Sequence, residues 1–233
     1  MLNFKFHKTL LLALTMTAAS AAGAKEFPFS YLRSSSFNIA KDFNAVPQLD
    51  SEVTAEDIKT MMKFQISRSP ADCARAESEV SVSVATFFGK PRGLLTELQV
   101  KTLDGFLEKV ALDSKYFIKM AKDYFQRPRP YESFQEIEPC ITKEKSYSFP
   151  SGHSALAYIW GDLLEEIIPL DKEKIHTRAD QIALDRTIAG VHFPSDIAES
   201  RKFATKVIEK LKTLKNFTND FEEVKNQFSK DQL

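Results

Sequence analysis

Residues 150–168 read PSGHSALAYIWGDLLEEII, and this stretch decides the fold. Its apolar side chains recur every three or four residues, which is the spacing of one face of a helix. That face consists of Leu156, Ile159, Trp160, Leu163 and Ile167. Ser151 stands where a helix N-cap is expected, and Pro169 follows where a helix must stop. The stretch therefore predicts a buried helix that begins at a Pro-Ser-Gly-His sequence.

The same spacing recurs on both sides of this stretch. Upstream it begins at Thr96 and, after a polar break at Asp113-Ser114, predicts a separate helix as far as Phe125. Downstream it covers residues 172–190 and 195–214 and continues towards the C-terminus. The chain has only seven glycines, which disfavours barrels and glycine-rich nucleotide loops. We therefore predict an all-α, single-domain helical bundle.

The N-terminal third carries weaker signals. Residues 25–53 show no periodicity, Thr54 is expected to cap a helix, and Ser69-Pro70 is expected to begin the next one. Between residues 80 and 84, valines alternate with serines as they do in a half-buried strand. A helix fits the same region equally well, with one face at Ala76, Val80, Val84 and Phe87. The neighbouring helices favour the helical interpretation.

Length and charge narrow the function classes. The chain has 233 residues, which suits one sizeable domain, and its 32 basic residues balance 32 acidic ones. Neutral overall charge gives no indication of nucleic acid or of an anionic membrane as partner. Residues 1–24 have the form of a secretory signal peptide: a basic start, an apolar run from Leu10 to Ala22, and the small residues Ala22-Gly23-Ala24. We expect cleavage after Ala24 and a domain of residues 25–233.

The alternative to a signal peptide is a membrane anchor. The apolar run is shorter than the roughly 20 residues that a spanning helix needs. The most apolar later segment, residues 155–168, carries Asp162, Glu165 and Glu166. The sequence therefore predicts a soluble protein that is periplasmic or secreted and is not stably inserted in a membrane. The oligomeric state stays open, a homo-oligomer included.

The chain has two cysteines, Cys73 and Cys140. In an oxidising compartment an isolated pair usually forms a disulfide, and removing such a bond typically costs about 2–5 kcal/mol. The alternative is a pair of buried thiols, because sequence does not show whether the two Cα atoms approach each other.

Three groups of residues can hold an anion. The first is Pro150-Ser151-Gly152-His153 at a helix start, where free N–H groups and the helix dipole favour negative charge. Ser151 can donate its hydroxyl, and Gly152 allows a ligand to approach the backbone. The alternative is that Ser151 only caps the helix and that His153 is incidental.

The second group is Lys122 with Arg129-Pro130. Lys122 lies one turn from the end of its predicted helix, so its amine can reach the following loop. Arg129 offers a planar fork that suits two phosphate oxygens. The alternative is a solvated basic helix end.

The third group is Arg186, His192 and Asp196. Arg186 lies near the end of one predicted helix, His192 in the loop after it, and Asp196 at the start of the next helix. A carboxylate that accepts a hydrogen bond from one imidazole nitrogen leaves the other nitrogen free to act as a nucleophile. We find no cluster of metal-ligand residues and therefore expect neither a metal nor another cofactor.

In this order, the patterns K-x6-RP, PSGH and R-x5-H-x3-D resemble the type 2 phosphatidic acid phosphatase superfamily. The soluble secreted branch of that superfamily is the bacterial class A non-specific acid phosphatases, and vanadium haloperoxidases share its fold. The motifs cover residues 122–196. Each motif is weak alone, but the three in order are specific.

The resemblance implies a metal-independent phosphomonoesterase that acts on small phosphomonoesters through a phosphohistidine. It implies that His192 attacks phosphorus, that Asp196 orients His192, and that His153 protonates the leaving alcohol and then activates water. It implies that the phosphate is held by Lys122, Arg129, Ser151, Gly152 and Arg186. Because an imidazole ordinarily has a pKa near 6.5, a mildly acidic pH optimum is expected.

One residue departs from the family pattern. The third motif normally begins Ser-Arg, whereas this chain has Asp185-Arg186. The Asp185 carboxylate could repel a phosphate dianion or pair with an arginine. Three other functions stay open: a lipid or lipid-A phosphatase at a membrane surface, a vanadate-dependent haloperoxidase, and a non-catalytic phosphate-binding protein disabled by Asp185.

Overall fold

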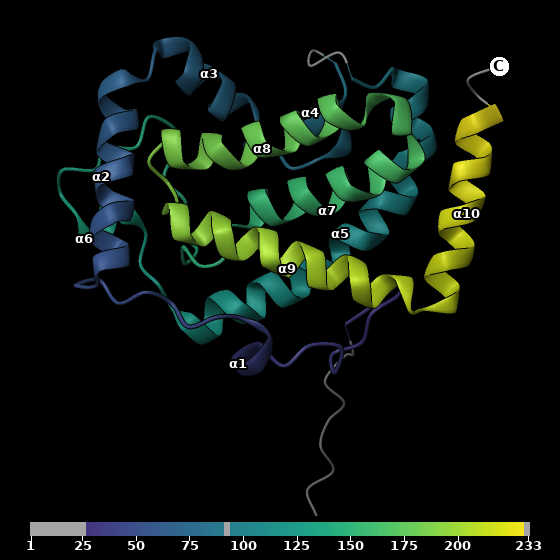
Figure 1. Cartoon of the computed structure of the whole chain (residues 1–233), viewed down its shortest axis with the longest axis horizontal. Coiled ribbons are helices and arrows are strands. Elements are labelled where there is room, and N and C mark those ends of the chain that lie inside the picture. The colour runs from purple at the N-terminus through teal and green to yellow at the C-terminus, as the bar shows by residue number, and fades with distance from the viewer. Residues whose placement is uncertain (1–26, 91–93, 231–233) are drawn as a thin grey trace, which may run out of the picture.

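The computed structural model describes residues 27–90 and 94–230, and all regular structure in those ranges is helical. The central helix is α7 (Gly152–Ile167). Around it lie α5 (Glu97–Phe125), α8 (Lys172–Ile188) and α9 (Pro194–Lys212) (Figure 1). The last helix, α10 (Lys215–Lys230), packs against α5 and α9. The predicted all-α bundle is confirmed, and the expected signal peptide of residues 1–24 lies outside the described residues.

Helix α7 is buried on nearly all sides because its neighbours cover both its apolar face and its small residues. Trp160 is fully buried and donates its indole N–H to the carbonyl oxygen of Leu107 on α5, at 3.0 Å. Gly161 faces α8 so closely that a Cβ there would lie 3.0 Å from the Cβ of Ala179. Replacing Trp160 by alanine would therefore remove about 3–5 kcal/mol of stability.

Helix α5 is continuous, so the predicted break at Asp113-Ser114 is wrong. The buried Asp113 carboxylate accepts backbone N–H groups of residues 30–32 at 2.7–2.8 Å. The Ser114 hydroxyl donates to the carbonyl oxygen of Val110, at 2.7 Å. Asp113 therefore fastens the N-terminal segment to α5, Ser114 bonds within α5, and the helix continues through both residues.

Four short or medium helices precede α5, and they are α1 (Ile39–Asp42), α2 (Glu52–Ser67), α3 (Pro70–Ser78) and α4 (Val84–Phe88). Ser51, not the predicted Thr54, caps α2, and Thr54 donates its hydroxyl to the carbonyl oxygen of Gln48. Ser69-Pro70 begins α3 as predicted, with a reciprocal capping box to Asp72.

Residues 76–87 form neither the strand nor the continuous helix that the pattern allowed. Helix α3 ends at Ser78, and Ser83 caps the separate helix α4. Between them the side chain of Glu79 is fully buried and pairs with arginines of α8. The two competing interpretations fail for the same reason, which is that a buried ion pair ends the helix.

The disulfide between Cys73 and Cys140 is present, with Cα atoms 5.7 Å apart. It joins α3 to the loop that runs from α6 (Pro130–Ser133) to α7. A one-turn 3₁₀ helix (Pro169–Asp171) then connects α7 to α8. The disulfide therefore ties two segments that both border the site described below.

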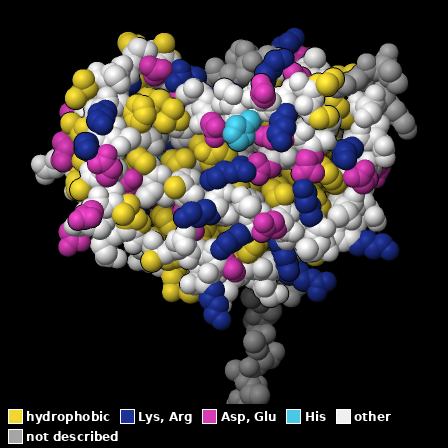
Figure 2. All heavy atoms as spheres, in the orientation of Figure 1, with side chains coloured by type: hydrophobic (Ala, Val, Ile, Leu, Met, Phe, Trp, Pro, Cys, Tyr) yellow, Lys and Arg dark blue, Asp and Glu magenta, His cyan; other side chains and the backbone are white. Residues whose placement is uncertain are grey.

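The outer face of α8 and α9 carries acidic and basic side chains side by side, without a patch of one sign (Figure 2). A shallow apolar groove lies where α2 meets these helices, with Phe64, Leu184 and Ile197 among its lining residues. Within residues 27–90 and 94–230, no helix combines the length and apolar character that crossing a bilayer requires.

Candidate active site

His192 lies in the turn between α8 and α9, which reverses the chain at Gly190. Gly190 has a φ of +80°, and a Cβ there would lie 3.1 Å from the Cα of Pro139. Glycine adopts this left-handed conformation without a steric penalty. The backbone N–H groups of Val191 and His192 both donate to the carbonyl oxygen of Arg186, at 3.1 and 3.2 Å. The turn therefore holds His192 beside the start of α9.

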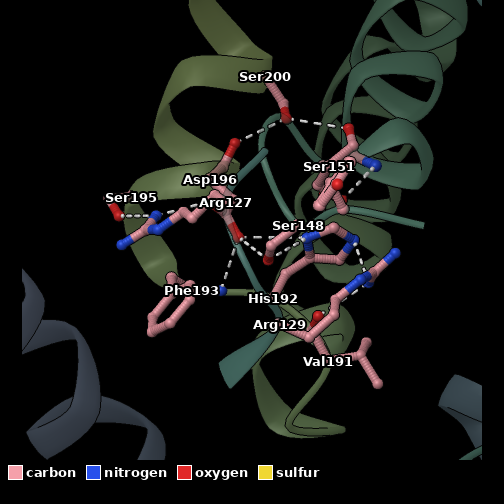
Figure 3. A network of polar contacts seen from close by, with 12 residues as sticks. Arg127, Arg129, Ser148, Ser151, Val191, His192, Phe193, Ser195, Asp196 and Ser200 are labelled. Atoms are coloured by element: carbon pink, nitrogen blue, oxygen red, sulfur yellow. Dashed lines mark hydrogen bonds and ion pairs between the residues drawn. The ribbon is translucent and has the colours of Figure 1, made fainter. Parts of the chain in front are cut away.

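Asp196, in the first turn of α9, is buried and accepts four hydrogen bonds (Figure 3). Its Oδ2 accepts from the Ser148 hydroxyl at 2.5 Å, the Phe193 backbone N–H at 3.0 Å and His192 Nδ1 at 3.3 Å. Its Oδ1 accepts from Arg127 Nη1 at 2.6 Å. Burial alone would raise the pKa of Asp196, but the bonds from His192 and Arg127 lower the pKa to about 2. Asp196 is therefore ionised.

The bonds to His192 assign its tautomer. A guanidinium only donates, and Arg129 Nη1 lies 2.9 Å from His192 Nε2, so Nε2 must accept. The ring proton is then on Nδ1, directed at Asp196. Burial, followed by the charge of Arg129, lowers the pKa of His192 to about 3. His192 is thus a neutral imidazole with a lone pair on Nε2, which is the form that a nucleophile needs.

Arg127 belongs to this network, although the sequence analysis assigned it no role. Besides Asp196, its guanidinium donates to the Ser195 hydroxyl at 2.8 Å and lies 3.5 Å from Asp57 on α2. It also stacks on the Phe193 ring, 3.8 Å from the ring centroid. The sequence repeats an Arg-Pro pair at residues 127–130, and this repeat could have pointed to Arg127. The repeat does not show which arginine binds Asp196 and which one binds an anion.

Arg129 reaches the other side of His192. It is fully buried, and its donors meet the carbonyl oxygens of Ser146 and Val191 at 2.8 and 2.9 Å. Its Nη2 donates to the carboxylate of Glu144 at 2.6 Å. Glu144 comes from the loop before α7, and no pattern in the sequence pointed to it. The arginine that was predicted to bind phosphate therefore binds the carboxylate of Glu144 in this structure.

His153 occupies the first turn of α7, on the far side of Glu144. Its Nε2 lies 3.1 Å from the carbonyl oxygen of Val80, so Nε2 carries the proton and donates. Its Nδ1 lies 4.0 Å from Glu144 Oε1. Burial, followed by the charge of Arg186, lowers the pKa of His153 to about 4, although Glu144 acts in the opposite direction.

Lys122, in the last turn of α5, donates to the carbonyl oxygen of Tyr147 and lies 3.4 Å from that of Ser148. Burial, followed by the charge of Arg129, lowers the pKa of Lys122 to about 7. Lys122 is therefore fully cationic only on the acid side of neutrality.

Arg186 is fully buried, and only one end of its guanidinium is occupied by the described residues. Its Nη2 donates to the carbonyl oxygen of Ala76 at 2.7 Å and to Glu79 at 3.0 Å. Its Nε and Nη1 have no partner among residues 27–90 and 94–230. Two buried donors of Arg186 therefore remain available to an anion.

Asp185, which replaces the serine of the family pattern, is neutralised by an arginine. Of the two alternatives, repelling a phosphate dianion or pairing with an arginine, the structure shows the second. Arg75 on α3 makes two parallel bonds of 2.7 Å to its carboxylate, and Gln181 adds a third at 2.8 Å. Asp185 is fully buried in this pairing. Its negative charge is therefore already compensated before any phosphate binds.

Ser151 and Gly152 act as helix-start residues in this structure. The Ser151 oxygen accepts from the backbone N–H and the hydroxyl of Ser154, at 3.4 and 2.9 Å, so Ser151 caps α7. A Cβ on Gly152 would meet only Ile118, at an ordinary contact distance of 3.7 Å. The predicted phosphate-binding roles of both residues stay predictions.

A pocket of about 550 Å³ opens beside these groups, and Lys122, Glu144, Gly152 and His153 line part of it. Glu144 connects the pocket to His192, because the same carboxylate binds Arg129, which touches His192 Nε2. Burial would raise the pKa of Glu144, but Arg129, the two histidines and Lys122 lower it to about 2. Predicted site residues from α5, α7, the loop before α6 and the turn between α8 and α9 thus surround one anionic group, which here is a carboxylate.

No group of acidic, histidine or cysteine side chains in the described ranges has the arrangement of a metal site.

Comparison with known proteins identifies the family that the chain resembles. The family model of the PAP2 superfamily matches residues 107–208, which contain all three motifs. The chain is 28% identical over 165 residues to a non-specific acid phosphatase of Providencia stuartii, covering 68% of this chain and 65% of that relative. Matches to two Salmonella non-specific acid phosphatases extend over about half of each relative.

Two solved structures support the fold. Aquifex aeolicus LpxE has a TM-score of 0.52 and 22% identity, over 66% of this chain and 94% of its own. A bacterial vanadium-dependent iodoperoxidase has a TM-score of 0.53 and 14% identity, over 74% of this chain and 54% of its own. At these identities the likeness concerns the helical arrangement. The resemblance to the superfamily that the motifs predicted is thereby confirmed.

Proposed function

From this similarity to the PAP2 superfamily and its non-specific acid phosphatases, we propose that the chain is a metal-independent phosphomonoesterase that forms a phosphohistidine. The observation that carries the proposal is the Glu144 carboxylate, which Arg129 binds at 2.6 Å and around which Lys122 and the two histidines are gathered. A phosphoryl group matches this environment better than a carboxylate does, because it also offers oxygens to the unpaired donors of Arg186.

The first chemical step is attack by His192 Nε2 on phosphorus. Arg129 must release this nitrogen and turn to the phosphoryl oxygens, which take the place of Glu144. As the N–P bond forms, the bond from phosphorus to the ester oxygen breaks. His153 gives its proton to the leaving oxygen, and Asp196 stabilises the positive charge that develops on the His192 ring.

The second step reverses these roles with water as the nucleophile. His153, now neutral, accepts a proton from water while the water oxygen attacks phosphorus. The N–P bond breaks, orthophosphate leaves, and His192 regains its lone pair. Lys122, Arg129 and Arg186 compensate the negative charge throughout, which is the main requirement of phosphoryl transfer.

The ionisation states favour acidic conditions, more strongly than the ordinary imidazole pKa suggested. Above about pH 3 His192 is neutral, and below about pH 7 Lys122 is charged. His153 has a pKa of about 4 in the free protein, and a bound phosphate dianion raises that pKa through its negative charge. We therefore expect the maximum of kcat, which reports the ionisation of the enzyme–substrate complex, between these limits and on the acid side of neutrality.

The test is hydrolysis of phenyl phosphate by the purified protein in the presence of EDTA, from pH 3.5 to 8. We expect turnover, inhibition by vanadate, and an acid-labile label on the protein after quenching with ³²P-labelled substrate. Detergent-dispersed lipid phosphates and halide oxidation with vanadate-loaded protein serve as parallel assays for the two related activities. Turnover of lipid phosphates alone, of halide alone, or of nothing while phosphate still binds would each overturn the proposal.

We also propose that the protein is exported, because residues 1–24 have the form of a signal peptide. N-terminal sequencing of the protein recovered from the periplasm or medium should begin at Lys25. A protein retained in the cytoplasm with Met1 intact would contradict this.

A further inference from the structure

The pocket of about 550 Å³ lies on the leaving-group side of the site. His153 and Lys122 line it, whereas His192 and Arg129 do not. In phosphoryl transfer the nucleophile and the leaving oxygen stand on opposite sides of phosphorus. With His192 as nucleophile and His153 as proton donor, the alcohol part of the substrate must extend into this pocket. The walls of the pocket therefore describe the alcohol, provided that the proposed function holds.

One wall of the pocket is apolar. It is formed by Val82 before α4, Ile118 on α5 and Leu156 on α7. The ring of Tyr147 lines the pocket from the loop before α7. An aromatic or aliphatic group that packs against an apolar wall binds favourably because apolar surface is removed from water. A strongly hydrated alcohol such as a sugar gains no binding free energy there. The wall thus suits an aromatic or aliphatic body next to the ester oxygen.

The other wall carries lysines. Lys115, Lys119 and Lys122 are spaced by four and three residues, which places them on one face of α5. Lys145 lines the same pocket from the opposite loop. The lysine row is defined here as Lys115, Lys119 and Lys145, the pocket lysines other than Lys122.

The charges of the lysine row are only partly compensated. Lys119 is paired with Asp123, which also lines the pocket, at 2.5 Å. The carboxylate nearest to Lys115 is that of Glu108, at the loose distance of 3.9 Å. Lys145 makes no ion pair with any residue that the structure describes, and Glu144 is held by Arg129. Lys115 and Lys145 can therefore bind a second anionic group.

We propose that the pocket selects phosphomonoesters whose alcohol has an apolar body and a second anionic group, bound by Lys115 and Lys145. The substrate class is thus a phosphomonoester that carries a further anionic group, a carboxylate or a second phosphate, remote from the reacting phosphate. This inference rests on the proposed function and adds a specificity to it.

Three aryl phosphates of similar size test it: 4-propylphenyl phosphate, 4-(2-carboxyethyl)phenyl phosphate and 4-(2-aminoethyl)phenyl phosphate. They differ in the charge at the far end, which is neutral, negative or positive. We expect kcat/KM at low salt to be roughly tenfold higher for the negative probe than for the positive one. This ratio should fall as salt is added, because the lysines are exposed.

The double variant Lys115→Gln with Lys145→Gln should bring the ratio close to one while leaving kcat/KM for the neutral probe within about twofold. Lys210→Gln, which changes an exposed lysine on α9, is the control and should keep the ratio of the unaltered protein. The double variant removes two positive charges and the control removes one, so an effect of overall charge alone would give the control about half of the loss.

The outcomes separate the two proposals. Hydrolysis of all three probes at equal rates would overturn the specificity and keep the phosphatase. Equal loss of charge preference in Lys210→Gln would overturn it as well, because the effect would then be one of overall charge. Hydrolysis of none of the probes would overturn the proposed function itself.

Discussion

The two histidines stand in environments of different kinds. The nucleophile half of the site, defined as His192, Asp196, Arg127 and Ser148, is buried, and its side chains bond to one another (Figure 3). The leaving-group half, defined as His153, Glu144 and Lys122, borders the pocket. There His153 has 12% of its side chain exposed and Glu144 30%. One half is a closed network, and the other, called the open half below, faces the pocket that we propose to admit substrate.

This difference matches what each half has to do. A nucleophile must be held in one tautomer and one direction, which a closed network of bonds achieves. An acid that serves many leaving groups needs access to solvent and an environment that changes when phosphate binds. Breaking each half in turn should therefore give different kinds of loss.

The largest effect is expected for His192→Ala. Because the variant has no atom that can form the covalent bond to phosphorus, kcat/KM for phenyl phosphate should fall by at least about 10⁴-fold. No labelled protein should appear after quenching. His176→Ala removes an exposed histidine of α8 and is the control, expected to keep full activity. Labelled protein in His192→Ala would assign the nucleophile to another residue.

The second effect is on stability and follows from breaking the closed network. Arg127→Met leaves the buried charge of Asp196 without its cation, and removing one partner of a buried pair costs about 3–5 kcal/mol. Arg201→Met breaks the pair with Asp162, in which 40% of the arginine side chain is exposed, and should cost about 0–1 kcal/mol. Urea unfolding measures both, and equal losses would show that the Arg127 network contributes nothing beyond a surface pair.

The third effect tests the open half. Glu144→Gln keeps the size of the side chain but removes the charge that competes with phosphate for Arg129. Inhibition by orthophosphate should strengthen by about tenfold, equivalent to about 1.4 kcal/mol. Because Glu144 raises the pKa of His153, the variant should also lose activity at lower pH than the unaltered protein does.

Glu136→Gln changes an exposed glutamate of the same loop and is the control for Glu144→Gln. It should alter neither the phosphate inhibition nor the pH profile. Weaker phosphate inhibition in Glu144→Gln would show that the carboxylate organises the cations for substrate instead of competing with it.

The closed half was largely accessible to sequence reasoning. His192 and Asp196 are four residues apart around a helix start, so their pairing follows from local geometry. The helices with a clear apolar face were predicted for the same reason. The break predicted at Asp113-Ser114 failed because Asp113 accepts from a distant segment, about which a local pattern carries no information, and Ser114 donates within its own helix.

In the open half His153 and Lys122 were predicted from the sequence, whereas Glu144 and the residues that support the site were not. Arg75 and Glu79 come from a segment more than 100 residues before their partners Asp185 and Arg186. Glu144 lies in a loop without periodicity, and its position depends on how that loop crosses the site. Such pairs are decided by tertiary packing. Asp185 is an example. Its effect on phosphate binding could not be predicted from the sequence, because that effect depends on its pairing with Arg75.

The smallest expected effect is the pH dependence of stability, to which the two histidines contribute. Both histidines are neutral in the folded protein, with a pKa of about 3 for His192 and about 4 for His153, both below the ordinary value near 6.5. A lowered histidine pKa gives stability that is complete above pH 6.5 and is lost as pH falls towards the folded value, because unfolding then takes up protons. Lys122, with a folded pKa of about 7, adds a fall of the same sign above that pH, so the contribution of the histidines is read between pH 6.5 and 5. The melting temperature should fall across this interval, and His192→Asn should reduce the fall. Orthophosphate should reduce it too, because its charge raises both pKa values, and an unchanged slope in both experiments would mean that the histidines are already charged in the fold.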